Sequence, residues 1–325
     1  MFSLSLLLAL LVAGPDDSSA AKTLFKPDLF QTLVDPDCSY CRDEAKRAGD
    51  ALRDDDRVLA WIRGQHDGGA IPYRWFLVPF RVLSDTYGVF VYDADADFVR
   101  AWPPSVDFRF QGWRNGVMVM KDKDGTLFDC LTGVAFEGPR KGERLVPLPS
   151  FESNWGPWLK ANPGTVAYMM YPKFKPMPLP AGVLSESLQT RPAPDARLGP
   201  EQRVFGLAIG AQSVAFPLTR FGVQPELLKT KLSEQDAVIL WEPSTRTAVS
   251  FAPETEGKNP EQVTLSVDLG DRDAPFIDRE TGSHWSMVGR AVSGSRKGAS
   301  LRWLPGVMIK WYAWAAEYPK TEIGS

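Results

Sequence analysis

Short runs of apolar residues, most of them β-branched or aromatic, recur along the chain between glycine-rich or charged stretches. Four such runs, at residues 89–92, 117–120, 238–241 and 263–267, are four or five residues long. Runs of this length and composition, with turn residues on both sides, predict strands rather than helices. We therefore expect a mainly β fold.

A helical spacing of apolar residues occurs at two places. Trp155 and Trp158 stand three residues apart just before Pro163, and the same pattern recurs from residue 311. Side chains three apart share one face of a helix, and a proline ends it. The pattern predicts short helices from residue 155 to about 161 and from residue 311 to about 317.

The chain resembles itself over a long segment. Residues 133–165 align without a gap with residues 289–321, and both carry Gly-x-Ala-x-x-Gly-x-Arg-Lys-Gly, Leu-x-x-Leu-Pro, Trp-x-x-Trp and Pro-x-Thr. The Arg-Lys-Gly is expected at a hairpin tip, where glycine supplies a positive φ. Looser matches join the strand-like residues 87–102 to residues 236–251. This self-similarity predicts two tandem copies of one β-rich module.

The first 14 residues are mostly apolar, and small residues follow as far as Ala20 and Ala21. About ten apolar residues are too few to span a bilayer about 30 Å thick, but they have the length of a signal-peptide core. We expect residues 1–21 to be a signal peptide cleaved near Ala20 or Ala21, with the mature chain secreted or periplasmic and without an integral membrane segment. A buried N-terminal strand or helix is the alternative.

Proline spacing suggests how the remaining chain is divided. Six prolines between residues 173 and 200 would interrupt strands and helices, so residues 176–201 are expected to form an extended linker. A small helical N-terminal segment would then cover residues 22–56, a first module residues 57–175 and a second module residues 202–325. The predicted fold class is mainly β (α+β), with one short C-terminal helix in each module.

The same motifs carry a resemblance to a known family. D-R-E-T-G-S-x-W-S at residues 278–286, followed by the glycine, Leu-x-x-Leu-Pro and Trp-x-x-Trp patterns, resembles the uncharacterised bacterial family called domain of unknown function 3179. The likeness covers residues 203–321 well and residues 57–165 more loosely. It implies an exported or membrane-associated protein and no established reaction. The Cys-Pro-Leu-Thr-Gly typical of members is replaced here at residues 93–97 and 242–246.

Three cysteines are the candidates for thiol chemistry. Cys38 and Cys41 form a Cys-x-x-Cys motif at the start of an expected helix, whose first amides would favour a thiolate. A structural disulfide, within this pair or to Cys130, is the simplest interpretation. A redox dithiol and a soft-metal site that also uses His66 are the alternatives. No cofactor is otherwise expected.

Four carboxylates, Asp93, Asp122, Glu242 and Asp278, stand at matching places in the two copies. Two carboxyls at a set separation could perform acid–base hydrolysis, but capping of turns explains their recurrence equally well. The alternating acids at residues 93–97 also have the spacing that begins a calcium loop, without its glycine and glutamate.

Tryptophan is abundant, with 11 in the chain. Trp61, Trp75, Trp102 and Trp113 occur only in the first copy and would either line a groove that stacks on sugars or fill the core. The net charge of −3 and the absence of a long basic run argue against a nucleic-acid partner. The favoured function is an exported, non-catalytic binding or scaffold protein with a glycan or protein ligand of unknown identity. A thiol-redox or metal-binding protein and a carboxylate-dependent hydrolase are the alternatives.

Overall fold

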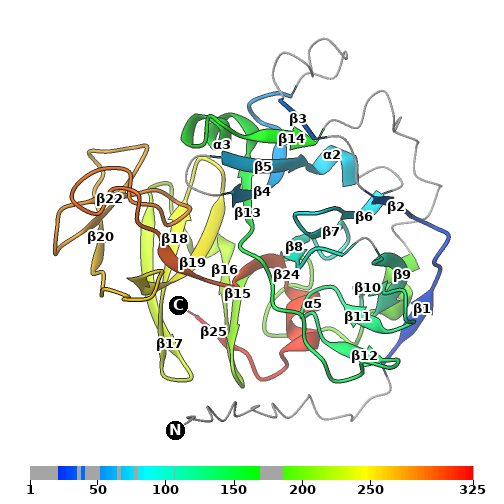
Figure 1. The fold of residues 1–325 in the computed structure, drawn as a ribbon. Coiled ribbons are helices and arrows are strands. Elements are labelled where there is room, and N and C mark those ends of the chain that lie inside the picture. The colour runs from blue at the N-terminus through cyan, green and yellow to red at the C-terminus, as the bar shows by residue number, and fades with distance from the viewer. Residues whose placement is uncertain are drawn as a thin grey trace, which may run out of the picture.

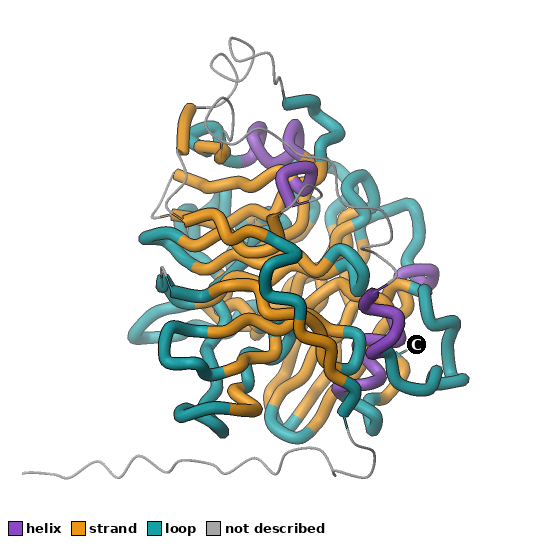
Figure 2. The backbone as a smooth tube through the Cα atoms, turned by 90° about the vertical axis from the view of Figure 1, so that its right-hand side faces the viewer, coloured by secondary structure: helices purple, strands orange, loops and turns teal. Residues whose placement is uncertain are grey.

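The computed structural model describes residues 21–34, 52–63, 67–76, 80–105, 107–168 and 186–324, together with the backbone of residues 38–40. Among these residues strands in several sheets far outnumber helices, which are few and short (Figure 1). Figure 2 shows the helices at the edges of the stacked sheets. The expectation of a mainly β fold is confirmed.

Three sheets come from the first half of the chain. The sheet ordered β13-β4-β5-β14-β3 contains Phe151–Asn154, Arg57–Arg63, Asp67–Pro72, Val166–Tyr168 and Cys38–Tyr40. The sheet ordered β2-β6-β7-β8 contains Gln31–Val34, Phe80–Ser84, Val89–Asp93 and Phe98–Trp102. The sheet ordered β1-β9-β10-β11-β12 contains Thr23–Phe25, Arg109–Arg114, Val117–Lys121, Leu127–Asp129 and Ala135–Glu137. Among the described residues of this half, α2 (Tyr73–Phe76) and α3 (Trp155–Ala161) are helical.

Three further sheets come from the second half. The sheet ordered β24-β15-β16-β25 contains Val307–Lys310, Arg203–Ile209, Gln212–Pro217 and Glu322–Ile323. The sheet ordered β17-β18-β19-β23 contains Glu226–Leu232, Gln235–Glu242, Thr247–Thr255 and Leu301–Leu304. The sheet ordered β20-β21-β22 contains Leu265–Val267, Phe276–Asp278 and His284–Trp285. Helix α5 (Trp311–Glu317) and two 3₁₀ turns, η1 (Ser187–Thr190) and η2 (Leu218–Arg220), complete the described elements.

Strand pairing in the first sheet of each half follows one scheme. The hairpin β4–β5 is flanked by β13, which is antiparallel, and by β14, which is parallel. The hairpin β15–β16 is flanked in the same way by β24 and β25. The register also agrees, because Arg57 faces Asn154 and Arg203 faces Lys310, as the sequence alignment requires.

Both Trp-x-x-Trp helices form as expected, with the expected bounds. In each helix the second tryptophan donates its indole N–H to a threonine seven residues later. The distance is 2.9 Å from Trp158 to Thr165 and 3.0 Å from Trp314 to Thr321. This bond holds the chain that leaves the helix against the tryptophan ring, and it satisfies a buried donor that would otherwise be costly.

The two Arg-Lys-Gly segments form turns, as predicted. Gly142 and Gly298 have φ values of +94° and +92°, which favour glycine. Their amides donate to the carbonyls of Ala135 and Ala291 at 2.8 and 2.9 Å. The short-range patterns of the repeated segments therefore correspond to the same local structures.

Hydrophobic cores form both within and between the halves. One core lies between the first two sheets of the first half and includes Leu59 and Phe90, and an equivalent core in the second half includes Phe205 and Trp241. Two further cores combine residues of both halves. They contain Trp311 and Trp314 with Trp102 and Met118, and Trp155 and Trp158 with Leu240 and Phe276. Helix α3 thus packs between its own sheet and the second half, and α5 packs between its own sheet and the first half.

The structure differs from the expected helix start at Cys38, and it describes only part of the linker expected at residues 176–201. Cys38–Tyr40 is not the start of a helix but a strand, which pairs with β14, because an exposed edge of that sheet offers it backbone partners. Residues 41–51 and the expected signal peptide up to residue 20 lie outside the described residues. Residues 186–200 of the expected linker pack against β9 and α5. Within the described residues, no helix is long and apolar enough to cross a membrane.

Candidate functional site

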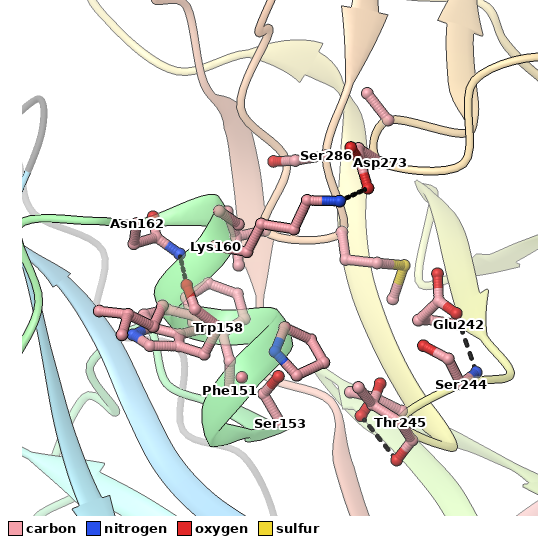
Figure 3. Close-up of a pocket in the computed structure, with 18 of the residues that line it drawn as sticks. Phe151, Ser153, Trp158, Lys160, Asn162, Glu242, Ser244, Thr245, Asp273 and Ser286 are labelled. Atoms are coloured by element: carbon pink, nitrogen blue, oxygen red, sulfur yellow. Dashed lines mark hydrogen bonds and ion pairs between the residues drawn. The ribbon is translucent and has the colours of Figure 1, made fainter. Parts of the chain in front are cut away.

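A cleft of about 1430 Å³ lies between α3 of the first half and the second half of the chain. Its walls are α3, the turn between β18 and β19, and the loops around the β20–β22 sheet (Figure 3). The floor is apolar and the rim is polar. The floor residues are Phe151, Trp155, Trp158, Leu159, Val249, Met287 and Val288, and the rim includes Ser153, Lys160, Glu242, Ser244, Thr245 and Asp273. An apolar floor with a few polar groups is typical of a binding site.

One ion pair bridges the mouth of this cleft. Lys160 Nζ of α3 lies 2.7 Å from Asp273 Oδ1 of the opposite loop, as Figure 3 shows. Both side chains are 69% exposed. Exposed pairs contribute little to stability, so this bridge can open at low energetic cost.

The place beside α5 that corresponds to the cleft is occupied by the chain itself. Helices α3 and α5 begin with the same backbone bonds, since the amides of Gly156 and Tyr312 donate to the carbonyls of Asp54 and Pro200, each at 3.0 Å. Tyr312 reaches across to the β9–β10 turn, where its hydroxyl donates to the carbonyl of Gly116. The aligned residue of α3, Gly156, has no side chain and makes no such contact.

A network of two arginines and two carboxylates connects the halves. Arg57 lies 2.9 Å from Glu152, and Arg203 lies 3.0 Å from Asp97. Each arginine also contacts the other carboxylate, at 3.2–3.3 Å. Glu152 is one of the residues that line the cleft. The sequence analysis missed this network, because its four members lie on four separate segments.

Asp93, a catalytic candidate, is buried beneath the β7–β8 turn. Its carboxylate accepts the amides of Asp95 and Ala96 at 3.1 and 3.0 Å and the amide of Met118 at 2.8 Å. Burial, assisted by the charge of Asp95, raises the pKa of Asp93 to about 7 despite these hydrogen bonds. All three bonds hold backbone, so the geometry is that of a turn cap.

The remaining carboxylate candidates also cap turns. Asp122 accepts the amides of Asp124 and Thr126. Asp278 accepts the Thr281 amide and the Trp285 indole N–H; burial opposes its ionisation, but these bonds outweigh burial and lower its pKa. Glu242 accepts the Ser244 amide at 2.9 Å, and it is the only one of the four that lines the cleft.

The alternating acids of residues 93–97 do not converge as a calcium loop would require. Asp93 points to backbone amides, whereas Asp97 pairs with Arg57 and Arg203. Among the residues that the structure describes, no group of three His, Cys, Asp or Glu side chains could hold a metal ion. His66 and Cys41 lie outside the described residues, and so does the side chain of Cys38.

Cys130 is a free, fully buried cysteine, so it does not form the disulfide to the N-terminal pair that was one of the two expected arrangements. The other arrangement, within the pair, concerns side chains outside the described residues. Burial raises the pKa of the Cys130 thiol well above 9.0, and the nearby charges of Asp129 and Asp93 act in the same direction. A thiol with a raised pKa remains protonated and reacts slowly. Cys130 therefore behaves as a core residue.

The four first-half tryptophans do not form an exposed aromatic groove. Trp61, Trp75, Trp102 and Trp113 are between 1% and 6% exposed and belong to the hydrophobic cores. Trp61 stacks on Phe90 with ring centroids 4.3 Å apart. These four tryptophans therefore fill the core, which was one of the two interpretations of the sequence. Large apolar side chains of this kind fill the space between packed sheets.

Residues 76–321 match the family described as "Protein of unknown function (DUF3179)". The match covers most of the chain. The protein belongs to this family. The resemblance inferred from its motifs is thereby confirmed. No curated protein and no solved structure matches the chain.

In this DUF3179 protein the match includes both walls of the cleft, α3 and the β18–β19 turn. Residues 93–97 and 242–246, which align with each other in the two halves, both form hairpin turns. Asp97 and Arg246 occupy the same left-handed position in those turns, with φ values of 51° and 53°. The sequence contained one sign of a difference between the two helices. The aligned Trp-x-x-Trp motifs have Gly156 in one and Tyr312 in the other, so a large side chain is present only beside α5.

Proposed function

We propose that this protein is an exported binding protein without catalytic activity of its own, and that its ligand lies in the cleft between α3 and the β18–β19 turn. The observation that carries the proposal is the cleft itself, about 1430 Å³ with an apolar floor and a polar rim. This volume exceeds the roughly 300–1,000 Å³ of typical small-molecule sites. It therefore favours a segment of a larger ligand.

The hydrogen bonds of the carboxylates favour binding over hydrolysis. Of the four carboxylates expected to serve hydrolysis, Asp93, Asp122 and Asp278 each accept amides of their own turns, and Glu242 alone lines the cleft. Hydrolysis by paired carboxyls requires two of them on either side of the reacting bond. The hydrolase alternative is correspondingly less well supported.

We propose further that the chain consists of two divergent tandem copies of one β-rich module. Equivalent strand registers, equivalent tryptophan–threonine bonds and equivalent glycine turns support this interpretation. The copies would then present one open and one filled version of the same surface. Binding would belong to the open version beside α3.

A substitution at the rim tests the binding site. Ser244 is exposed and lines the cleft, so Ser244→Trp should obstruct it, whereas Ser295→Trp places the same ring on an exposed turn away from the cleft. Thermal-shift assays with defined synthetic peptides and unbranched glycans should reveal a ligand class that stabilises wild type and Ser295→Trp but not Ser244→Trp. Binding that Ser244→Trp leaves unchanged, or no binding by either class, would overturn the proposal.

Export is tested by the N-terminus of the mature chain. When the full chain is expressed in a bacterium with a general secretion pathway, mass spectrometry of the purified protein should show cleavage near Ala20 or Ala21. An intact chain found only in the cytoplasmic fraction would contradict export.

A further inference from the structure

We propose that the outer edge of β17, in the second half, binds an extended strand of another polypeptide. This strand would run parallel to β17, with an apolar side chain beside Leu228 and acidic side chains beside Lys229 and Lys231. The surface is separate from the cleft and belongs to a different sheet edge. The basis for it lies in the first half of the chain, where the equivalent edge already carries a strand.

The strand of the first half that corresponds to β17 is β6. Leu83 of β6 faces Phe90 of β7, and Leu228 of β17 faces Ile239 of β18. Phe90 and Ile239 are aligned in the internal repeat. Leu83 and Leu228 therefore hold the same place, each on the strand that begins its hairpin.

The outer edge of β6 is covered by the N-terminal segment of the chain. Strand β2 pairs with β6 in parallel, and Leu33 lies beside Leu83. The two leucines are 1% and 0% exposed and belong to the core between the first two sheets. In the same segment β1 covers the outer edge of β9. An added strand and its apolar side chain thus complete this edge.

The outer edge of β17 has no such strand among the residues that the structure describes. There β17 pairs with β18 and ends the sheet. Leu228, the counterpart of Leu83, is only partly buried against its core. Hydrogen-bonded and non-hydrogen-bonded residues alternate along an antiparallel strand, so every second residue of β17 directs its backbone N–H and C=O to the open side. An edge of this kind is a template for a further strand.

The neighbouring elements are compatible with a strand at this place. Strand β20 lies beside β17 (Figure 1). In the first half β9 lies beside both β6 and β2, so a neighbouring sheet does not prevent the pairing. The described residues that lead into the second half, 186–200, pack against β9 and α5 instead.

The side chains along the edge favour an acidic partner. Lys229 is exposed and makes no ion pair within the described part of the chain. Lys231 pairs with Glu234 at the hairpin turn, where the side chains are 54% and 91% exposed, and such a pair is easily exchanged. Glu226 is already used, because its carboxylate accepts the Gly222 amide. Lys229 and Lys231 point to one face of the strand, and acidic residues two apart would face both of them.

The same lysines disfavour a second copy of this chain as the occupant. If two β17 edges paired about a twofold axis, Lys229 and Lys231 of both copies would share one face. Like charges on neighbouring strands are destabilising, and lysines on edge strands are a common protection against self-association. The partner is therefore a different polypeptide, in which apolar and acidic residues alternate.

Two fluorescently labelled peptides provide the test by fluorescence polarisation. QTLEVEV keeps residues 31–33 of β2 and places glutamates where they face Lys229 and Lys231, and QTLKVKV has lysines there. Wild type should bind QTLEVEV about tenfold more tightly than QTLKVKV, since two attractive cross-strand pairs replace two repulsive ones. Lys229→Glu with Lys231→Glu should reverse this preference. Lys297→Glu with Lys320→Glu, the same charge change at exposed residues outside β17, should preserve it.

Hydrogen exchange followed by mass spectrometry locates the bound peptide. Amides of residues 226–232 should exchange more slowly in the complex with QTLEVEV, because the open edge acquires hydrogen-bond partners. Ser244→Trp, which obstructs the cleft, should leave the affinity for QTLEVEV unchanged. The edge of β17 and the cleft can therefore succeed or fail as binding sites independently.

Failure of QTLEVEV to bind would overturn the proposal, as would a preference that charge reversal at Lys229 and Lys231 does not invert. Protection that appears only outside β17 would count equally against it. Loss of binding in Ser244→Trp would place the peptide in the cleft instead. Wild-type dimers in analytical ultracentrifugation, with the amides of β17 already protected, would identify a second copy as the occupant and would also overturn it.

Discussion

At the scale of single residues, buried polar groups in this protein mainly hold turns of the backbone. Asp93 is the clearest case, with three backbone amides directed at its two carboxylate oxygens. A carboxylate in this position joins the β7–β8 turn to β10, which begins at Val117. Its burial gives it an unusual titration, which can be measured.

The titration of Asp93 should make stability depend on pH. Its pKa is raised in the folded protein from 3.8 to about 7, mainly by burial. The folded state therefore binds more protons than the unfolded state between these values, and the stabilisation is lost as the pH rises through 7. We expect the free energy of unfolding of wild type, relative to Asp93→Asn, to fall between pH 3.8 and about pH 7 in urea titrations. A difference that stays constant or increases would contradict this assignment.

The two helix-starting tryptophans offer a matched pair at the same scale. Trp311→Phe removes a donor that satisfies the carbonyl of Asp195, whereas Trp155→Phe removes a donor without a partner. Because the loss of ring volume is the same, Trp311→Phe should be the more destabilising by about 1 kcal/mol, the net contribution of one hydrogen bond. Chemical denaturation of both variants measures the difference. Equal losses would show that the indole N–H of Trp155 is not a free donor.

At the scale of elements, glycine turns decide where the strands reverse, but they differ in what surrounds them. Gly142 has φ +94° and nothing within 4 Å of the position where a Cβ would be. Gly133 has φ +70°, and a Cβ there would lie 2.6 Å from the Trp102 ring. The first position needs only backbone freedom, whereas the second also needs the absence of a side chain.

This difference predicts that alanine at Gly133 lowers the free energy of unfolding more than alanine at Gly142. Gly142→Ala should cost about 1–2 kcal/mol, the strain of a positive φ in a residue with a Cβ. Gly133→Ala adds a collision with Trp102 in a closely packed core, and overpacking typically adds a further 1–3 kcal/mol. Denaturant midpoints of the two variants at constant slope give the comparison. A Gly133→Ala variant as stable as Gly142→Ala would refute the packing at Trp102.

At the scale of the whole molecule, the halves are interlocked through two of their four cores. Helix α5 packs with Trp102 of the first half, and α3 packs with Phe276 of the second half. The sheet of β1 and β9–β12 and the sheet of β20–β22 lie at opposite ends of the molecule (Figure 1). Neither half can bury the outward faces of its helix and sheets without the other.

The second half alone should therefore not fold. A fragment of residues 202–325 would expose Trp311, Trp314 and Ile309, which the first half covers in the intact chain. We expect this fragment to lack a cooperative thermal transition and the intact protein to unfold in one transition, as judged by calorimetry and tryptophan fluorescence. A cooperatively folding fragment, or two separate transitions in the intact chain, would show that the shared cores are unimportant for stability.

Local features were predictable because each depends on neighbours in the chain. The strand at residues 89–92, the two seven-residue helices and the turns at Gly142 and Gly298 were all expected from their patterns. The helical start expected at Cys38 was wrong, because pairing with β14 overrides the local capping signal. Propensity is a weak prior wherever a sheet edge offers backbone partners.

The candidate site was only partly accessible to sequence reasoning. Glu242 was singled out for hydrolysis and lines the cleft, but the sequence could not show that α3 would face it from the other half. Trp155 was expected to fill a core, and it does, yet its unpaired donor became visible only from the surrounding atoms. The exchange of Gly156 for Tyr312 was readable in the alignment, but its meaning required the distance that Tyr312 spans.

The sequence by itself therefore determined the kinds of elements, their ends and their repetition, because these follow from side-chain periodicity, proline and glycine within a few residues. Tertiary structure alone decided which tryptophans are buried, which half each helix faces, and where the cleft beside α3 lies. Those outcomes depend on contacts between segments more than a hundred residues apart, such as Tyr312 with Gly116, and no local pattern encodes them.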